Sequence, residues 1–120
     1  MHKVMLIEDD RTMLSLLNTL LGMEGFKVIM AGDESVDVVY QAFKTEKPDA
    51  ALLDVNLRHV SGLDVLRRVR QDPELNSVRV IMSSGIDYHE QCVKAGAQGF
   101  ILKPYMPDDL INMIRQALSA

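Results

Sequence analysis

The sequence predicts an α/β fold, a doubly wound five-stranded parallel sheet with flanking helices. Two observations support this prediction. Five short apolar runs alternate with segments of helical periodicity, which is the pattern of βαβ units around a parallel sheet. The length of 120 residues is that of one domain, and we therefore expect a single domain over residues 1–120.

The five apolar runs predict the strands, and four of them end in residues that can carry chemistry. With their polar ends included, the runs cover residues 4–10, 26–30, 50–54, 78–85 and 99–104. The first and third runs end in carboxylates, the fourth in hydroxyls, and the fifth in a lysine followed by proline. Open α/β sheets bind ligands outside the carboxyl ends of their strands, so these groups are expected to converge at one edge of the sheet.

Capping residues and apolar spacing predict the helices. Asp10 is placed to cap the first helix, and Gly25 is placed to end it. Asp33 can cap the second helix. The remaining helices are expected from about Ser61 to Arg70, from about Asp87 to Ala95, and from Pro107 onward.

The composition argues against binding to nucleic acid or to a membrane. A net charge of −4 opposes the positive field that nucleic acid requires. Arg67, Arg68 and Arg70 cluster in the third predicted helix, where we interpret them as a solvated face. No apolar run approaches the roughly 20 residues that span a bilayer. The single cysteine, Cys92, fits a reducing cytosol, and we expect a soluble, cytoplasmic domain.

Glu8, Asp9 and Asp54 predict a site for a metal ion and a phosphoryl group. Three carboxylates in one small space repel each other unless a cation neutralises them. Oxygen ligands in an incomplete cage favour Mg²⁺ over Ca²⁺, and Asp54 is the candidate nucleophile. The competing interpretation is that Glu8 and Asp9 only favour the start of the first helix. That interpretation leaves Asp54 without an explanation.

The chain resembles a response-regulator receiver domain over essentially its whole length. The matching residues, in order and at the family's spacing, are Glu8, Asp9, Asp54, Gly62, Ser84, Phe100, Lys103 and Pro104. The resemblance implies the (βα)5 flavodoxin-like receiver fold. It also implies a two-component or phosphorelay role, in which Asp54 accepts a phosphoryl group with Mg²⁺. The donor would be a sensor histidine kinase or a phosphotransfer protein.

The resemblance also implies a set of metal ligands. Asp9 and Asp54 would bind Mg²⁺ directly, Glu8 would act through water, and Asn56 would add its backbone carbonyl.

Further roles on the phosphoryl side of the site follow from the same resemblance. Ser84 and Lys103 would bind the phosphoryl oxygens, and Gly85 would keep the entrance open. The Lys103–Pro104 peptide bond is expected to be cis. Phe100 would rotate inward when Ser84 moves, which would change the surface of the fourth helix, fifth strand and fifth helix.

The implied role is that of a signalling switch rather than an enzyme, although receivers catalyse their own phosphorylation and dephosphorylation. Three residues depart from the family pattern: Arg58 replaces a proline, Met106 replaces a capping residue, and Ser84 replaces a threonine. The chain is expected to be either a complete protein or the receiver of a longer one. The sequence does not specify its output domain or downstream protein.

Three other functions compete with this one. A phosphatase or mutase of the haloacid-dehalogenase-like kind would need an acid two positions after Asp54, where this chain has Asn56. A nucleotide-binding module would need a glycine-rich loop after the first strand, where this chain has acids. A degenerate receiver that only binds partners is disfavoured because every reacting group is present.

Overall fold

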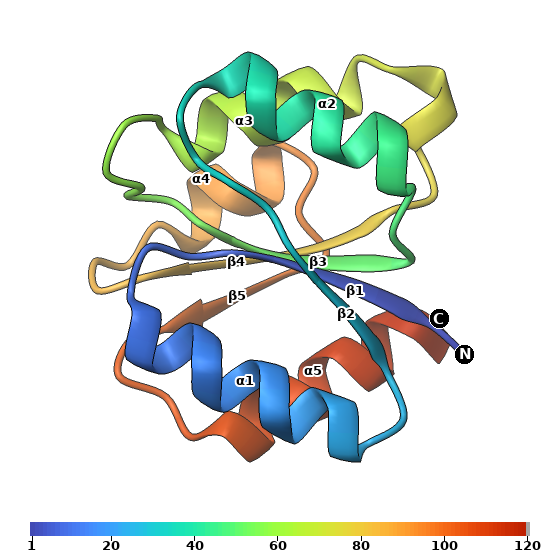
Figure 1. The fold of residues 1–120 in the computed structure, drawn as a ribbon. Helices are drawn as coiled ribbons and strands as arrows, with labels where there is room; N and C mark the ends of the chain where they lie inside the picture. Colours follow the sequence, from blue (N-terminus) through green and yellow to red (C-terminus); the bar gives the residue numbers. More distant parts are fainter. Residues whose placement is uncertain (120) are drawn as a thin grey trace.

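The computed structural model describes residues 1–119 as a five-stranded parallel sheet with helices on both faces (Figure 1). The strands are β1 (Lys3–Ile7), β2 (Lys27–Met30), β3 (Ala50–Asp54), β4 (Arg79–Ser84) and β5 (Gly99–Leu102). Their order in the sheet is β2-β1-β3-β4-β5, and every neighbouring pair is parallel. The predicted fold class is confirmed.

The helices form two layers around the sheet. They are α1 (Arg11–Met23), α2 (Val36–Glu46), α3 (Gly62–Arg70), α4 (His89–Lys94) and α5 (Pro107–Ser119), with a short 3-10 helix, η1 (Pro73–Leu75), before β4. One face of the sheet is covered by α1 and α5, and the other by α2, α3 and α4 (Figure 1). None of the helices within residues 1–119 has the length and apolar character needed to cross a membrane.

The core is split by the sheet into two apolar clusters. Met5 and Ile7 of β1 belong to the cluster on the α2–α4 side, whereas Val4 and Leu6 belong to the cluster on the α1–α5 side. Side chains of a strand point alternately to its two faces, so a strand covered by helices on both sides must be apolar at every position. All four of these side chains are fully buried. This burial on both faces holds the central strands in place. Their polar C-terminal ends therefore lie at one edge of the sheet.

The start of α1 agrees with the sequence prediction, but the start of α2 does not. The Asp10 side chain caps α1 by accepting a hydrogen bond from the Met13 backbone N–H at 3.1 Å. The cap of α2 is Ser35, whose hydroxyl accepts from the Val38 backbone N–H at 3.1 Å. The prediction of Asp33 as this cap is wrong, because the helical backbone begins only at Val36.

The fourth helix is shorter than predicted. It runs from His89 to Lys94, and its first flanking residue, Tyr88, makes no side-chain capping hydrogen bond. The backbone N–H of His89 in the first turn donates instead to Asp87 Oδ1 at 3.0 Å, so a side chain two residues upstream takes part of the capping role. By contrast, α5 begins at Pro107, as predicted.

The prediction of a solvated arginine face is wrong for Arg70. Its side chain is half-buried and donates hydrogen bonds to four oxygens of η1, of the connection between η1 and β4, and of the connection between α4 and β5. The acceptors are Gly96 O at 2.9 Å, Leu75 O at 3.2 Å, Val78 O at 2.7 Å and Gln98 Oε1 at 2.7 Å. Burial lowers the pKa of Arg70. Arg70 therefore joins segments of the α3–α4 layer, whereas Arg67 and Arg68 are exposed and form ion pairs with Asp64 and Asp37.

Candidate functional site

Parallel pairing brings the polar strand ends together. Ile7 of β1 is paired with Leu53 of β3, so the next residues of the two strands, Glu8 and Asp54, are neighbours. Lys103 directly follows β5 and reaches the same edge, where its backbone N–H donates to the Ser84 carbonyl oxygen at 2.8 Å. The convergence expected from the sequence is therefore present in the fold.

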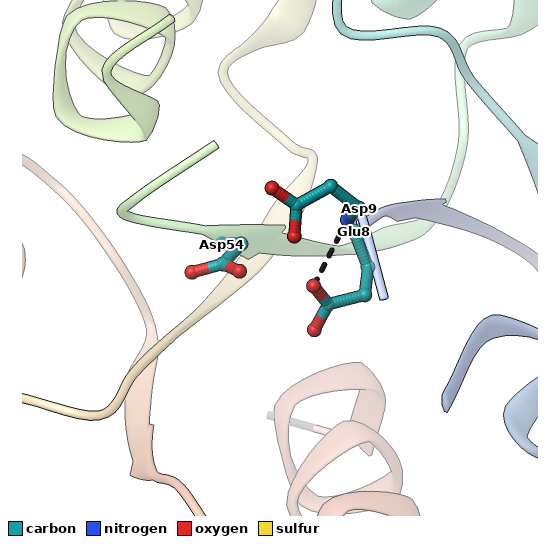
Figure 2. A group of neighbouring side chains, drawn as sticks. All are labelled: Glu8, Asp9 and Asp54. Carbon is teal, nitrogen blue, oxygen red and sulfur yellow. Dashed lines mark hydrogen bonds between the residues drawn. The ribbon is translucent and has the colours of Figure 1, made fainter. Parts of the chain in front are cut away.

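Three carboxylates gather at this edge (Figure 2). Glu8, Asp9 and Asp54 each place a carboxylate oxygen within 4.8 Å of the others. Glu8 and Asp54 are 5% and 4% exposed, and Asp9 is partly exposed. Burial, and then the nearby Glu8 carboxylate, raise the pKa of Asp9. Water is thus largely excluded from a cluster of like charges, and this situation favours a bound cation.

Lys103 is the one cation that contacts this cluster among residues 1–119. Its Nζ lies 2.8 Å from Asp54 Oδ2 and 2.7 Å from Glu8 Oε1. Burial alone would lower the pKa of Lys103, but its hydrogen bond to Asp54 and its ion pair with Glu8 outweigh burial and raise it. A single ammonium leaves two of three carboxylate charges without compensation. The cluster offers only oxygen ligands and keeps a net negative charge. Both properties suit a hard divalent ion such as Mg²⁺.

Glu8 is already held by the protein. Its Oε2 accepts hydrogen bonds from the backbone N–H groups of Asp9, at 2.9 Å, and Asp10, at 3.2 Å. Its Oε1 contacts Lys103. Because both oxygens have partners, Glu8 is more constrained than Asp9, which agrees with an indirect role for Glu8 at a metal ion.

The loop after β3 folds back closely onto Asp54. The Asn56 backbone N–H donates to Asp54 Oδ1 at 3.1 Å, and the Gly62 N–H donates to the Val55 carbonyl oxygen at 2.8 Å. A Cβ at Gly62 would lie 2.1 Å from the Asp54 carbonyl oxygen, which no side chain can occupy. The close approach of the two backbones explains why a glycine stands at this position.

Ser84 is buried at the end of β4 and is engaged with the same loop. Its hydroxyl donates to Asn56 Oδ1 at 3.0 Å and accepts from the Ile86 backbone N–H at 3.1 Å. The sequence analysis assigned Asn56 only a backbone role and missed this side-chain contact. Next to it, no atom lies within 4 Å of the place a Cβ would take at Gly85, so the entrance has room for a small side chain.

Phe100 is the second residue of the edge strand β5. Its ring is partly buried, packs against the cluster on the α2–α4 side, and meets the His89 ring edge to face at a centroid distance of 6.2 Å. The Lys103–Pro104 peptide bond is cis.

Tyr105 is a neighbour of the site that the sequence analysis did not identify. Its hydroxyl is buried without a hydrogen-bond partner among the described residues. Burial, followed by the charge of Glu8, raises the pKa of Tyr105 to about 12. It lines a hollow of about 340 Å³ together with Glu8 and Lys103. A tyrosine directly after the Lys-Pro step was the only signal in the sequence.

Known proteins resemble this chain in sequence and in fold. A family model described as the response regulator receiver domain matches residues 4–115. The transcriptional regulatory protein CpxR of Escherichia coli (strain K12) is 33% identical over 98% of this chain and 50% of its own length. The chemotaxis protein CheY of Bacillus subtilis (strain 168) is 24% identical over 98% of both chains.

A solved structure shows the same similarity. The crystal structure of a putative response regulator from Chloroflexus aurantiacus J-10-fl matches with a TM-score of 0.88 and 28% identity. This match covers 99% of this chain and 98% of the other. The chain spans about half the length of CpxR and of several other curated relatives that it matches.

Proposed function

The chain belongs to the response regulator receiver domain family, the receivers of two-component signalling, and from this premise we propose that Asp54 accepts a phosphoryl group from a sensor histidine kinase or phosphotransfer protein. The observation that carries this proposal is the contact of Lys103 with both Asp54 and Glu8 inside a cluster of three carboxylates. A nucleophile, a cation for phosphoryl oxygens and candidate metal ligands thus meet at one point. We take the receiver to cover residues 1–120.

The proposed metal is Mg²⁺, held by the carboxylates of Asp9 and Asp54 and the backbone carbonyl of Asn56, with Glu8 acting through water. When bound, the ion would screen the repulsion between the Asp54 carboxylate and an incoming phosphoryl group. The raised pKa of Asp9 and the uncompensated charge of the cluster support this assignment.

In the proposed transfer, a carboxylate oxygen of Asp54 forms a bond to phosphorus while the bond from phosphorus to the donor's imidazole nitrogen breaks. Lys103, already 2.8 Å from Asp54 Oδ2, is placed to share its ammonium with the phosphoryl oxygens. Ser84 would turn its hydroxyl from Asn56 to the phosphoryl group. The reaction modifies the protein itself, so we propose a signalling switch rather than an enzyme with a separate substrate, one that also catalyses its own dephosphorylation.

The reorientation of Ser84 has a modest driving force. A hydrogen bond between neutral groups, such as the one from Ser84 to Asn56, contributes about 0.5–1.5 kcal/mol, and one to a charged group about 1.5–3 kcal/mol. The difference of about 1 kcal/mol changes an equilibrium about fivefold. This is sufficient only for a switch whose two states are already close in free energy.

The proposed output surface comprises α4, β5 and α5. The two helices flank the edge strand β5 from opposite faces of the sheet (Figure 1). Four apolar side chains are exposed in or near these elements: Ile86, Val93, Leu102 and Met106. Together with the short helix α4 and the partly buried Phe100, they support a surface that a partner recognises. That partner, or an output domain, would act downstream in the cytoplasm, without nucleic-acid or membrane binding by this domain.

Removal of the proposed metal ligand Asp9 tests the magnesium site. In Asp9→Asn, the Mg²⁺ concentration that gives half-maximal phosphorylation by acetyl phosphate should rise at least about 10- to 100-fold, because metal-site substitutions of this kind weaken affinity by such factors. A chelator should abolish the reaction in the wild type. Asp64→Asn, which removes an exposed acid of α3 outside the cluster, is the control. An unchanged Mg²⁺ titration in Asp9→Asn would exclude Asp9 as a ligand.

Ser84→Ala tests the coupling between the site and the output surface. The variant should still accept beryllofluoride, a phosphoryl mimic, but the amide chemical shifts of α4 and Phe100 should change far less than in the wild type. Ser83→Ala is the matched control, because the neighbouring Ser83 hydroxyl is buried without a partner in residues 1–119. Wild-type shifts in Ser84→Ala would refute the coupling through this hydroxyl.

A further inference from the structure

A cleft of about 510 Å³ opens beside the carboxylate cluster, and neither Asp54 nor Lys103 lines it. Glu8 and Asp9 form one part of its wall. Arg11 of α1 and two residues of the loop after β3, Arg58 and His59, line it as well. A cleft that joins proposed metal ligands to several basic side chains is suited to hold the part of an anionic donor that is not transferred.

The backbone that carries Arg58 is held at both ends of its loop. Asn56 and Ser61 form an antiparallel bridge across the loop, and the Gly62 N–H is bonded to the Val55 carbonyl oxygen. Leu57, the residue before Arg58, is 8% exposed and belongs to the core. Arg58 therefore starts from a fixed position beside the cluster, and only its side chain has to adjust.

The two arginines of the cleft differ from the other arginines of the chain. Among residues 1–119, no hydrogen bond or ion pair engages the guanidinium of Arg58 or Arg11, although both are exposed beside acids. The other five arginines all have partners: Arg67, Arg68 and Arg115 pair with carboxylates, and Arg70 and Arg79 donate to carbonyl oxygens. Both arginines without partners thus line the cleft that Glu8 and Asp9 share.

We propose that Arg58, assisted by Arg11, binds the leaving group of the phosphodonor and favours donors whose leaving group departs as an anion. This inference rests on the proposed phosphorylation of Asp54. Three carboxylates, the Lys103 ammonium and one divalent ion are together formally neutral, so the cluster itself would not attract a departing anion. The remaining acid of the cleft, Asp33, belongs to the connection between β2 and α2 and would repel an anion, which leaves the arginines as the binding groups.

Two small donors separate the effect of leaving-group charge from that of phosphoryl transfer. With acetyl phosphate, the Asp54 oxygen bonds to phosphorus, the bond from phosphorus to the bridging oxygen breaks, and acetate leaves with the electron pair and a negative charge. With phosphoramidate, whose nitrogen is already protonated, the phosphorus–nitrogen bond breaks and neutral ammonia leaves. An arginine that stabilises the leaving group assists only the first reaction.

The test measures phosphorylation rates of the full chain with each donor, in Mg²⁺, for wild type and Arg58→Gln. The acetyl phosphate rate should fall about fivefold in the variant, the size expected for one exposed charge pair, and the phosphoramidate rate should change less than twofold. Arg58→Lys should keep most of the acetyl phosphate rate. High salt should reduce the difference between wild type and Arg58→Gln. Arg67→Gln, at an exposed arginine of α3, is the control and should behave as wild type.

Equal beryllofluoride binding by wild type and Arg58→Gln will establish that the site is intact in the variant. An unchanged acetyl phosphate rate, or equal slowing with both donors, would overturn the assignment of Arg58 while leaving the proposed function in place. A wild-type protein that takes a phosphoryl group from neither donor would overturn the proposed function and this inference with it.

Discussion

Asp54→Asn should abolish phosphorylation of this protein by acetyl phosphate in Mg²⁺. The amide that replaces the carboxylate is a poor nucleophile and carries no charge for a metal ion, so the substitution removes both functions proposed for Asp54. The side chain is 4% exposed at the end of β3, and asparagine has nearly the same shape, so the fold should be retained. Intact-protein mass spectrometry should find one phosphoryl group on the wild type and none on the variant.

Asp10→Asn is the matched control for this experiment. Asp10 belongs to the same acidic run but caps α1, and asparagine is an equally good capping residue. This variant should be phosphorylated to the wild-type level. An adduct of equal yield in Asp54→Asn would place the phosphoryl group on another residue and contradict the assignment.

Gly62→Ala should cost this protein about 3 kcal/mol of its free energy of unfolding, as severe overpacking does. The new Cβ would lie 2.1 Å from the Asp54 carbonyl oxygen and 3.0 Å from the Val55 Cα. Both neighbours are backbone atoms of a buried segment, so the loop has to move as a unit. Because Asp54 is one of the displaced residues, the phosphorylation rate should fall as well. Urea unfolding and acetyl phosphate kinetics measure the two effects.

Gly22→Ala should change the free energy of unfolding in the opposite direction, and it serves as the control. Gly22 is the next-to-last residue of α1, its φ is not positive, and no atom is within 4 Å of its prospective Cβ. Alanine is favoured over glycine in a helix by up to about 1 kcal/mol, so this variant should be somewhat more stable than the wild type. If the free energy of unfolding of Gly62→Ala were within about 0.5 kcal/mol of the wild-type value, the close backbone approach would not constrain this position.

The sequence by itself determined the fold class and the place of the site. Strand β3 has the bounds predicted for it, because a strand buried on both faces is a continuous apolar run. Once parallel strands are inferred, their polar ends must meet at one edge, and the cluster of Glu8, Asp9 and Asp54 follows from that topology. These features depend on patterns within short segments and on a general rule of parallel sheets, so one sequence was sufficient to predict them.

The tertiary structure alone decided which partners these groups have. The Ser84 hydroxyl faces Asn56, and Arg70 donates to the carbonyl of Gly96, 26 residues away, although helical spacing predicted a solvated position. Lys103 meets Asp54 across 49 residues. Such contacts depend on strand register and on how layers pack, which local propensity does not encode. The sequence therefore determined which chemical groups reach the sheet edge, while packing of distant segments determined the hydrogen bonds that hold them there.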